Sequence, residues 1–135
     1  MIYGVGTDIL DASRISNILK KFDKKFISRI YGKNEISFLN NKLKNQNLFL
    51  SKRFAAKEAF WKAISPQRGD GLLFREIEVL NDKNGKPYFY FSGKTEEYIK
   101  KKEEGLHGNL KFDISLSDEP PYVIAFVVIS LALIG

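Results

Sequence analysis

A chain of 135 residues that is 44 % hydrophobic and 28 % charged has the composition of an ordinary folded domain, which excludes a disordered or fibrous protein. It contains no cysteine, which excludes a disulfide framework and a cysteine-based nucleophile or metal site, and it fits a reducing cytoplasm. The net charge of +6 favours an acidic partner: a phosphorylated ligand, nucleic acid or an acidic protein.

The first half of the chain predicts one strand and three helices. Residues 2–9 alternate in side-chain character and are rich in β-branched side chains, and both features are typical of a strand. Asp11 or Ser13 can cap the helix that follows, and its apolar spacing predicts a core-facing stripe of Ile15, Ile18, Leu19, Phe22 and Phe26. We expect a short helix over residues 34–43, a polar connector over residues 42–47, and a long helix over residues 48–64 that ends before Pro66.

The second half predicts a hairpin, a helix and two further strands. The hairpin joins residues 74–80 to residues 87–91 through a turn that contains Asn84-Gly85. A helix over residues 95–102 precedes strands over residues 111–116 and 122–129. We expect a single α+β domain over residues 1–135, with a mostly antiparallel sheet packed against the long helix. The apolar run over residues 122–134 is too short to cross a bilayer, and the first residues show no signal peptide.

Asp8, Glu58 and Lys62 are the residues that most clearly suggest chemistry. Asp8 stands at the end of the first predicted strand, and Glu58 precedes Lys62 by one turn of the long helix, so both project from the same side. Proteins usually hold Mg²⁺ with one or two carboxylates, completed by water and phosphate oxygens, and a lysine offsets phosphoryl charge. The same residues also fit a structural interpretation, in which Asp8 caps the first helix and Glu58 and Lys62 form an exposed ion pair.

Three short blocks follow one another along the chain. They are Gly4-Val5-Gly6-Thr7-Asp8-Ile9 followed by Arg14-Ile15, then Arg53-Phe54-Ala55-Ala56-Lys57-Glu58-Ala59-Phe60, then Asn84-Gly85-Lys86-Pro87. In this order and spacing they resemble the holo-acyl-carrier-protein synthases, the small bacterial members of the 4′-phosphopantetheinyl transferase superfamily. The resemblance extends over residues 2–129, and the ordered set is far more specific than any one block.

The resemblance implies a reaction and a fold. The reaction is transfer of 4′-phosphopantetheine from coenzyme A to a serine of apo acyl carrier protein, with release of adenosine 3′,5′-bisphosphate. Asp8 and Glu58 would bind Mg²⁺ and Lys62 would lie against the coenzyme A pyrophosphate, so that the protein supplies positioning and electrostatics. The resemblance also implies the 4′-phosphopantetheinyl transferase fold and a homotrimer with active sites between subunits.

The same resemblance assigns further residues to the two substrates. Arg14, Lys21 and Lys25 lie on one flank of the first helix, where the family docks its acidic carrier protein, and complementary charge raises encounter rates. Each basic residue also fits an ordinary solvated surface. The residues assigned to coenzyme A are Arg53, Lys57, Asn84, Gly85, Lys86 and Pro87, with Lys42 and Lys44 nearby.

Two positions depart from the family pattern. Ser65-Pro66-Gln67 replaces a glycine-threonine-glycine loop, so a backbone phosphate cradle is not expected there. Asp113 stands where the family commonly has a histidine, and a carboxylate would repel phosphate. The one histidine, His107, is expected to be a loop residue because it lies between Gly105 and Gly108.

Two other functions remain open at this point. A coenzyme A-binding homologue without turnover would fit the Asp113 and Ser65 departures, although the intact carboxylate pair argues against it. A nucleic-acid-binding domain would fit the basic charge and the aromatic run Tyr88-Phe89-Tyr90-Phe91, but that run lacks an RNA-binding signature and leaves Asp8 and Glu58 without a role. The sequence favours the transferase, with coenzyme A and acyl carrier protein as partners and with neither nucleic acid nor a membrane.

Overall fold

The computed structural model describes residues 1–40 and 45–134, and it confirms the α+β class with antiparallel pairing. Lys42, Lys44 and the end of the second predicted helix lie outside the described residues. Within the described part of the chain, no helix is long and apolar enough to cross a membrane. The elements are β1 (Ile2–Asp11), α1 (Ala12–Ile30), α2 (Lys33–Asn40), α3 (Gln46–Ile64), the 3-10 turn η1 (Phe74–Glu76), β2 (Ile77–Asn81), β3 (Pro87–Phe91), α4 (Gly93–Leu106), β4 (Gly108–Glu119) and β5 (Tyr122–Leu133).

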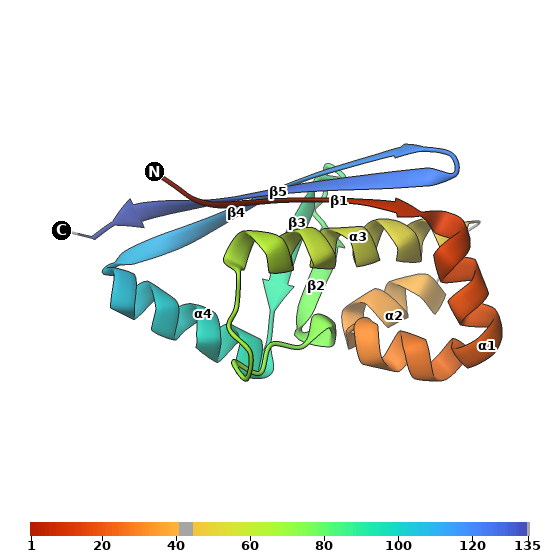
Figure 1. The fold of residues 1–135 in the computed structure, drawn as a ribbon, viewed down its shortest axis with the longest axis horizontal. Coiled ribbons are helices and arrows are strands. Elements are labelled where there is room, and N and C mark those ends of the chain that lie inside the picture. Colours follow the sequence, from red (N-terminus) through yellow and green to blue (C-terminus); the bar gives the residue numbers. More distant parts are fainter. Residues whose placement is uncertain (41–44, 135) are drawn as a thin grey trace.

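The fold has a three-stranded antiparallel sheet with the helices on one side of it (Figure 1). The strand order is β1-β5-β4, so the last strand of the chain lies between the first strand and β4. The long helix α3 runs along the inner face of this sheet, and the β2–β3 hairpin forms a separate two-stranded sheet below it. Phe60 of α3 contacts Phe89, Phe91 and Phe112, and this aromatic cluster joins α3, the hairpin and β4.

The contact between β1 and α3 depends on two glycines. A Cβ atom at Gly4 or Gly6 would overlap the backbone carbonyl oxygens of Ala63 and Ala59, respectively. The strand therefore lies directly on the helix backbone, closer than any side chain would permit. Because alternate residues of a strand share a face, Asp8 is on the same side of β1 as these glycines and is directed toward α3.

Several predicted boundaries were too short or of the wrong type. Strands β4 and β5 extend well beyond the predicted residues 111–116 and 122–129, and α4 begins at Gly93 rather than at residue 95. The predicted strand over residues 74–80 is wrong at its start, because Phe74–Glu76 forms a 3-10 turn. The end of α3 is as predicted: Ser65 caps it in the left-handed conformation, with φ 49°, before Pro66.

The predicted apolar stripe of α1 is wrong at Phe22, whose surface is 57 % exposed. Ile15 is buried, and Leu19 and Phe26 pack against the core, as expected. Phe22 is the last residue before a kink at Asp23, which has φ 31° and ψ −103° and interrupts the helix. Residues on the two sides of this kink no longer share the helical rotation on which the predicted spacing depends. Asp11 caps the helix by accepting a hydrogen bond from the Ser13 amide at 2.9 Å, as predicted for one of the two candidates.

Lys57 has no exposed surface, and this contradicts the prediction that it contacts coenzyme A. Its ammonium donates three hydrogen bonds, to Glu35 Oε1 at 2.7 Å, Ile77 O at 2.7 Å and Phe74 O at 2.9 Å. The Glu35 carboxylate, also buried, accepts further bonds from the amides of Gly32 and Val79. All three protons of the ammonium are therefore used inside the protein, and none is available to a ligand.

The Lys57–Glu35 pair joins three elements that are distant in sequence. Burial lowers the pKa of Lys57 and raises the pKa of Glu35, because each charged form has lost its water; the attraction between the two opposes both shifts. A second buried carboxylate, Glu78, accepts from the Glu35 amide at 2.9 Å and from Asn34 Nδ2 at 2.9 Å. Together these bonds attach α2 and β2 to one face of α3.

We expect Lys57→Met to destabilise the fold by about 3–5 kcal/mol, because it leaves Glu35 buried without its partner. Denaturant unfolding measures this change. Lys52→Met is the matched control: it removes a lysine from the same helix that pairs with Asp118 at 2.6 Å near the surface, and it should cost no more than about 1 kcal/mol. A Lys57→Met protein with normal stability but weak coenzyme A binding would contradict the structural role.

Candidate functional site

The structure brings Asp8, Glu58 and Lys62 together where β1 crosses α3; we call these three residues the first half-site. Lys62 Nζ donates to the backbone oxygen of Thr7 at 2.9 Å and to Asp8 Oδ1 at 3.2 Å. Glu58 is one helical turn before Lys62 on the same side of α3. The prediction that these three residues lie close together is confirmed. The alternative interpretation, in which Asp8 caps the first helix, is wrong, because Asp11 caps α1.

The charges of the first half-site act on one another. The pKa of Glu58 is raised, first because partial burial disfavours its charged form and then because the Asp8 carboxylate repels it. Lys62 and Arg14 oppose this rise. Arg14, on the first turn of α1, is therefore close enough to influence Glu58, which the sequence did not indicate.

The donor set of the first half-site fits a hard divalent cation. Its two carboxylates could both contribute oxygen ligands, and the described residues contain no cluster of three or more histidine, aspartate or glutamate side chains that would enclose a metal. Mg²⁺ is commonly bound by one or two carboxylates and keeps its other positions for water and phosphate oxygens. Asp8 and Glu58 are thus the residues that could hold it.

A second group of predicted residues lines a hollow of about 330 Å³ between α3, the β2–β3 turn and β4; we call it the second half-site. Of the residues predicted to bind coenzyme A, Arg53, Gly85 and Pro87 line it. Asn84 and Lys86 are exposed in the same turn, where Asp82 Oδ1 accepts from both of their amides. The sequence did not identify the other lining residues, which are Lys52, Asn81, Ile114, Ser115 and Leu116.

Arg53 is held rigidly at the edge of this hollow. Its guanidinium donates to Asn81 Oδ1 at 2.5 Å and lies over the Phe49 ring, 3.8 Å from the ring centroid. The side chain is mostly buried, and its Nε has no hydrogen-bond partner within the protein. Asn81 could have been found from the sequence, because it pairs with Pro87 at the mouth of the predicted hairpin.

The two half-sites lie on different faces of α3. Arg53 and Glu58 are five residues apart, which corresponds to about 140° around a helix. Lys57, one turn after Arg53, is inside the molecule. The sequence pattern placed all these residues in one site, and a single copy of the chain does not bring them together.

The two departures from the family pattern have clear positions. The Ser65 hydroxyl donates to the Lys62 carbonyl at 2.9 Å, so it completes the end of α3. Asp113 pairs with Val128 and lies on the outward face of the three-stranded sheet. His107, as expected, is not in an element: it caps α4 in the left-handed conformation, with φ 54°.

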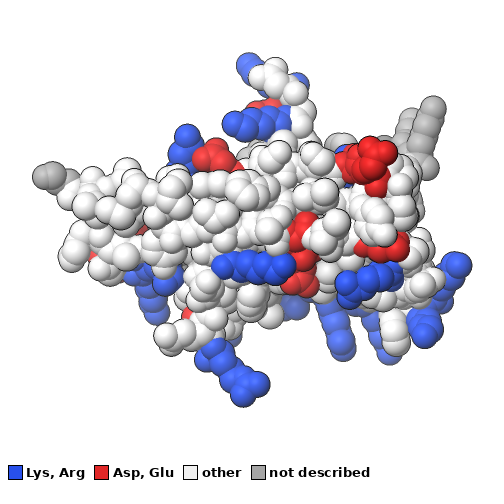
Figure 2. All heavy atoms as spheres, turned by 45° about the horizontal axis from the view of Figure 1, so that its top comes forward, with Lys and Arg blue, Asp and Glu red and all other residues white. Residues whose placement is uncertain are grey.

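The outward face of the three-stranded sheet is apolar and exposed. Figure 2 shows a broad area without charge over this sheet, with lysine and arginine side chains toward its edges. The strand register brings its apolar side chains side by side in pairs, such as Ile9 with Ile124 and Val5 with Val128. The large apolar side chains that are at least 40 % exposed here are Val5, Ile9, Tyr122, Ile124 and Phe126.

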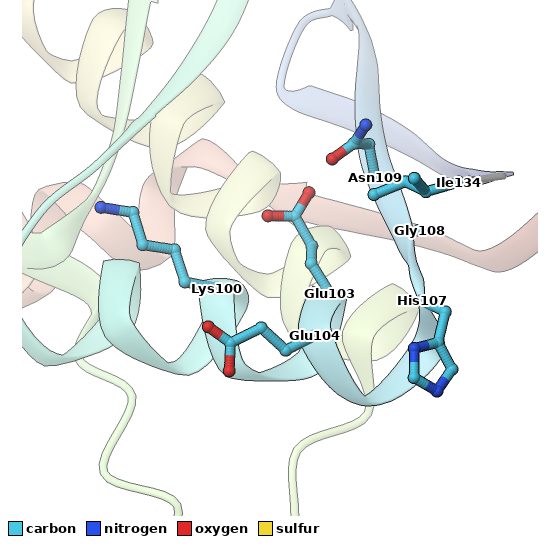
Figure 3. Close-up of a pocket in the computed structure, with 7 residues that line it drawn as sticks. All are labelled: Lys100, Glu103, Glu104, His107, Gly108, Asn109 and Ile134. Carbon is cyan, nitrogen blue, oxygen red and sulfur yellow. The ribbon is translucent and has the colours of Figure 1, made fainter.

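Two further hollows lie away from both half-sites. One, of about 440 Å³, follows α1 and is lined by Phe22, Phe26 and Ile30 between the basic residues Lys25 and Arg29. The other, of about 550 Å³, lies where α4 meets β4; Figure 3 shows the Glu103, Glu104 and His107 side chains around it. Glu103 already accepts a hydrogen bond from the Leu110 amide at 2.7 Å, so this hollow has no evident chemistry.

Known proteins resemble this chain over nearly its whole length. A holo-[acyl-carrier-protein] synthase from Orientia tsutsugamushi is 44 % identical over 131 residues, which are 96 % of this chain and 98 % of that protein. The crystal structure of the holo-[acyl-carrier-protein] synthase from Neisseria meningitidis superposes with a TM-score of 0.82, with 39 % identity and coverage of 96 % and 99 % of the two chains.

A third relative was solved with a ligand. It is the holo-[acyl-carrier-protein] synthase of Helicobacter pylori in complex with coenzyme A, with a TM-score of 0.73, 28 % identity and coverage of 93 % and 99 %. The family model described as the 4′-phosphopantetheinyl transferase superfamily matches residues 4–127, which include both half-sites. The chain belongs to the 4′-phosphopantetheinyl transferase superfamily.

Proposed function

We propose that this protein transfers the 4′-phosphopantetheine group of coenzyme A to a serine of apo acyl carrier protein and releases adenosine 3′,5′-bisphosphate. The observation that carries the proposal is the first half-site: two carboxylates and a lysine meet where β1 crosses α3, in a chain 44 % identical to a holo-[acyl-carrier-protein] synthase. A pair of hard oxygen ligands beside an ammonium suits a pyrophosphate substrate.

Asp8 and Glu58 are the proposed Mg²⁺ ligands, and Lys62 is the proposed contact to the pyrophosphate. Bound Mg²⁺ would supply positive charge to the pyrophosphate oxygens. More than half of the Lys62 side chain is exposed, so its ammonium is able to reach a substrate phosphate at the surface. The serine oxygen forms a bond to the β-phosphorus while the bond from that phosphorus to the oxygen bridging the two phosphates breaks, and the serine proton passes to water or to a side chain of the first half-site.

The second half-site is the proposed place of the nucleotide end of coenzyme A. Arg53 lines this hollow, and the turn at Gly85 and Pro87 lies beside the exposed Lys86. A guanidinium and a lysine are suitable partners for phosphate. Lys57 is no longer part of this proposal, because its ammonium is buried.

We also propose the homotrimer, with each active site shared by two subunits. Two features of the described chain support it: the half-sites lie on different faces of α3, and the outward face of the three-stranded sheet exposes large apolar side chains. Contiguous exposed apolar surface commonly marks a protein interface. A neighbouring copy that covers this face could bring its second half-site to the first half-site of its partner.

The proposed carrier surface is α1. Arg14, Lys21 and Lys25 are exposed on it, and the groove lined by Phe22, Phe26 and Ile30 adds apolar contacts beside Lys25. An acidic amphipathic helix would find both complementary charge and an apolar groove here. The kink at Asp23 lies within this surface, directly after the exposed Phe22.

The alternative functions are weaker on structural grounds. Phe89 and Phe91 pack on Phe60, so only Tyr88 and Tyr90 of the aromatic run are exposed, and a nucleic-acid-binding function still leaves Asp8 and Glu58 without a role. A coenzyme A-binding homologue without turnover remains the second candidate, because Asp113 and Ser65 depart from the family pattern. The cytoplasmic location stays a prediction.

The deciding experiment is intact-mass spectrometry of apo acyl carrier protein incubated with this protein, coenzyme A and Mg²⁺. We expect a gain of one phosphopantetheine that is lost with EDTA. Glu58→Gln should slow the transfer by roughly 10²-fold or more without unfolding the protein, because it removes a charged ligand. Normal transfer by this variant would exclude Glu58 as a ligand, and no transfer by the folded wild type with several carriers would support the homologue without turnover.

Arg14→Ala should raise the KM for the carrier by about threefold or more and leave the KM for coenzyme A unchanged, because a charge at an interface edge acts mainly on encounter. Steady-state kinetics with each substrate varied in turn measures both constants. Lys101→Ala, which removes an exposed lysine from α4, is the control. If Arg14→Ala weakened coenzyme A binding instead, Arg14 would belong to the first half-site.

The shared active site can be tested by mixing two inactive variants. Glu58→Gln damages the first half-site, and Lys86→Glu should damage the second by repelling phosphate. Mixed oligomers should recover about a quarter of the wild-type activity, the chance that a random interface pairs the two intact halves. Mixed oligomers without activity would show that both halves serve the same subunit.

A further inference from the structure

Lys62 is bound to the same atoms that a cation would use. Its ammonium lies 2.9 Å from the Thr7 carbonyl oxygen and 3.2 Å from Asp8 Oδ1. Carbonyl and carboxylate oxygens are the ligands of hard metal ions as well as the acceptors of an ammonium. The lysine reaches them from α3 across the contact with β1, so it joins the two elements of the first half-site.

Asp8 is the more buried partner of this ion pair. The Asp8 side chain is only 17 % exposed, whereas the side chain of Lys62 is 55 % exposed. The lysine is thus the mobile partner: it has four rotatable bonds and open space around it, while Asp8 is fixed on a strand. A divalent cation beside Asp8 would repel an ammonium at hydrogen-bond distance from the same carboxylate.

We infer that Lys62 occupies the cation position of Asp8 in the metal-free protein and must leave Asp8 when a divalent cation binds. The inference rests on the proposed function, because it needs Asp8 and Glu58 as the cation ligands. It assigns Lys62 two successive partners. Lys62 pairs with Asp8 before the metal is bound, and afterwards its ammonium is free for the substrate phosphate. Lys62 therefore sets the affinity of the free protein for its cation.

The test is Mn²⁺ binding to the full chain without coenzyme A, measured by electron paramagnetic resonance. Lys62→Met should bind Mn²⁺ about three- to tenfold more tightly than the wild type, because the competing ammonium is gone. Lys101→Met is the control, since it removes an exposed lysine of α4 that lines neither half-site, and its affinity should be unchanged. An equal gain in both variants would reduce the effect to net charge and overturn the inference.

A second readout follows the lysine itself. In the wild type, Mg²⁺ should speed the acetylation of Lys62 by an amine-reactive reagent, measured by peptide mass spectrometry, because the released ammonium is more accessible. Lys101, exposed on α4 and outside both half-sites, should react at the same rate with and without Mg²⁺. A Lys62 rate that Mg²⁺ leaves unchanged or lowers would overturn the inference.

Two variants separate this inference from the proposed function. If Asp8→Asn and Glu58→Gln abolish Mn²⁺ binding while Lys62→Met binds like the wild type, the metal site stands and the inference fails. If neither the wild type nor Lys62→Met binds Mn²⁺, the inference also fails, because a free Asp8 then makes no site. Tight binding by Lys62→Met that is lost on adding Asp8→Asn supports it, whether or not the wild type transfers phosphopantetheine.

Discussion

The buried ion pair between Lys57 and Glu35 determines which way the central helix faces. The Lys57 ammonium satisfies all its protons inside the protein, on Glu35 and on two carbonyls at the start of the β2 segment. Rotation of α3 would leave two charges unpaired in the interior, which is among the most costly changes that a fold can suffer. With Lys57 turned inward, Glu58 and Lys62, which are about 100° and 140° further round the helix, are turned toward β1. The side chains of the first half-site are therefore oriented by an ion pair that is buried elsewhere in the protein.

The other determinant of the site is the absence of side chains on β1. Gly4 and Gly6 let the strand rest on the backbone of α3, and the next residue on that face, Asp8, then meets Lys62. Because backbone packs on backbone, the distance between β1 and α3 is fixed, and this brings a carboxylate and a lysine from elements some 50 residues apart in sequence within reach of each other. Such preorganised charge is what phosphoryl transfer requires of a protein.

The sequence indicated the first half-site well and the rest of the site less well, for identifiable reasons. Glu58 and Lys62 could be predicted to share a side because their spacing is local to one helix. Lys57 was assigned wrongly because spacing shows which residues share a face but not whether that face is buried, and its partner Glu35 is 22 residues away. Phe22 was assigned wrongly because helical spacing shows that it shares a side with Ile15 and Leu19 but not how far along the helix the core extends, and nothing in the spacing indicates that the helix is interrupted at Asp23. The second strand of the hairpin, residues 87–91, was predicted correctly because the turn before it is specified by local sequence.

The position of the half-sites on different faces of α3 has a consequence for how the protein works at low concentration. If neighbouring copies complete each site, as proposed, a folded monomer is inactive, and specific activity depends on total protein by mass action. Dilution would then inactivate the enzyme by dissociating its subunits, without unfolding them. In a cell that makes little of this protein, the rate of carrier modification would fall more steeply than the amount of protein, because a smaller fraction of the protein would be assembled.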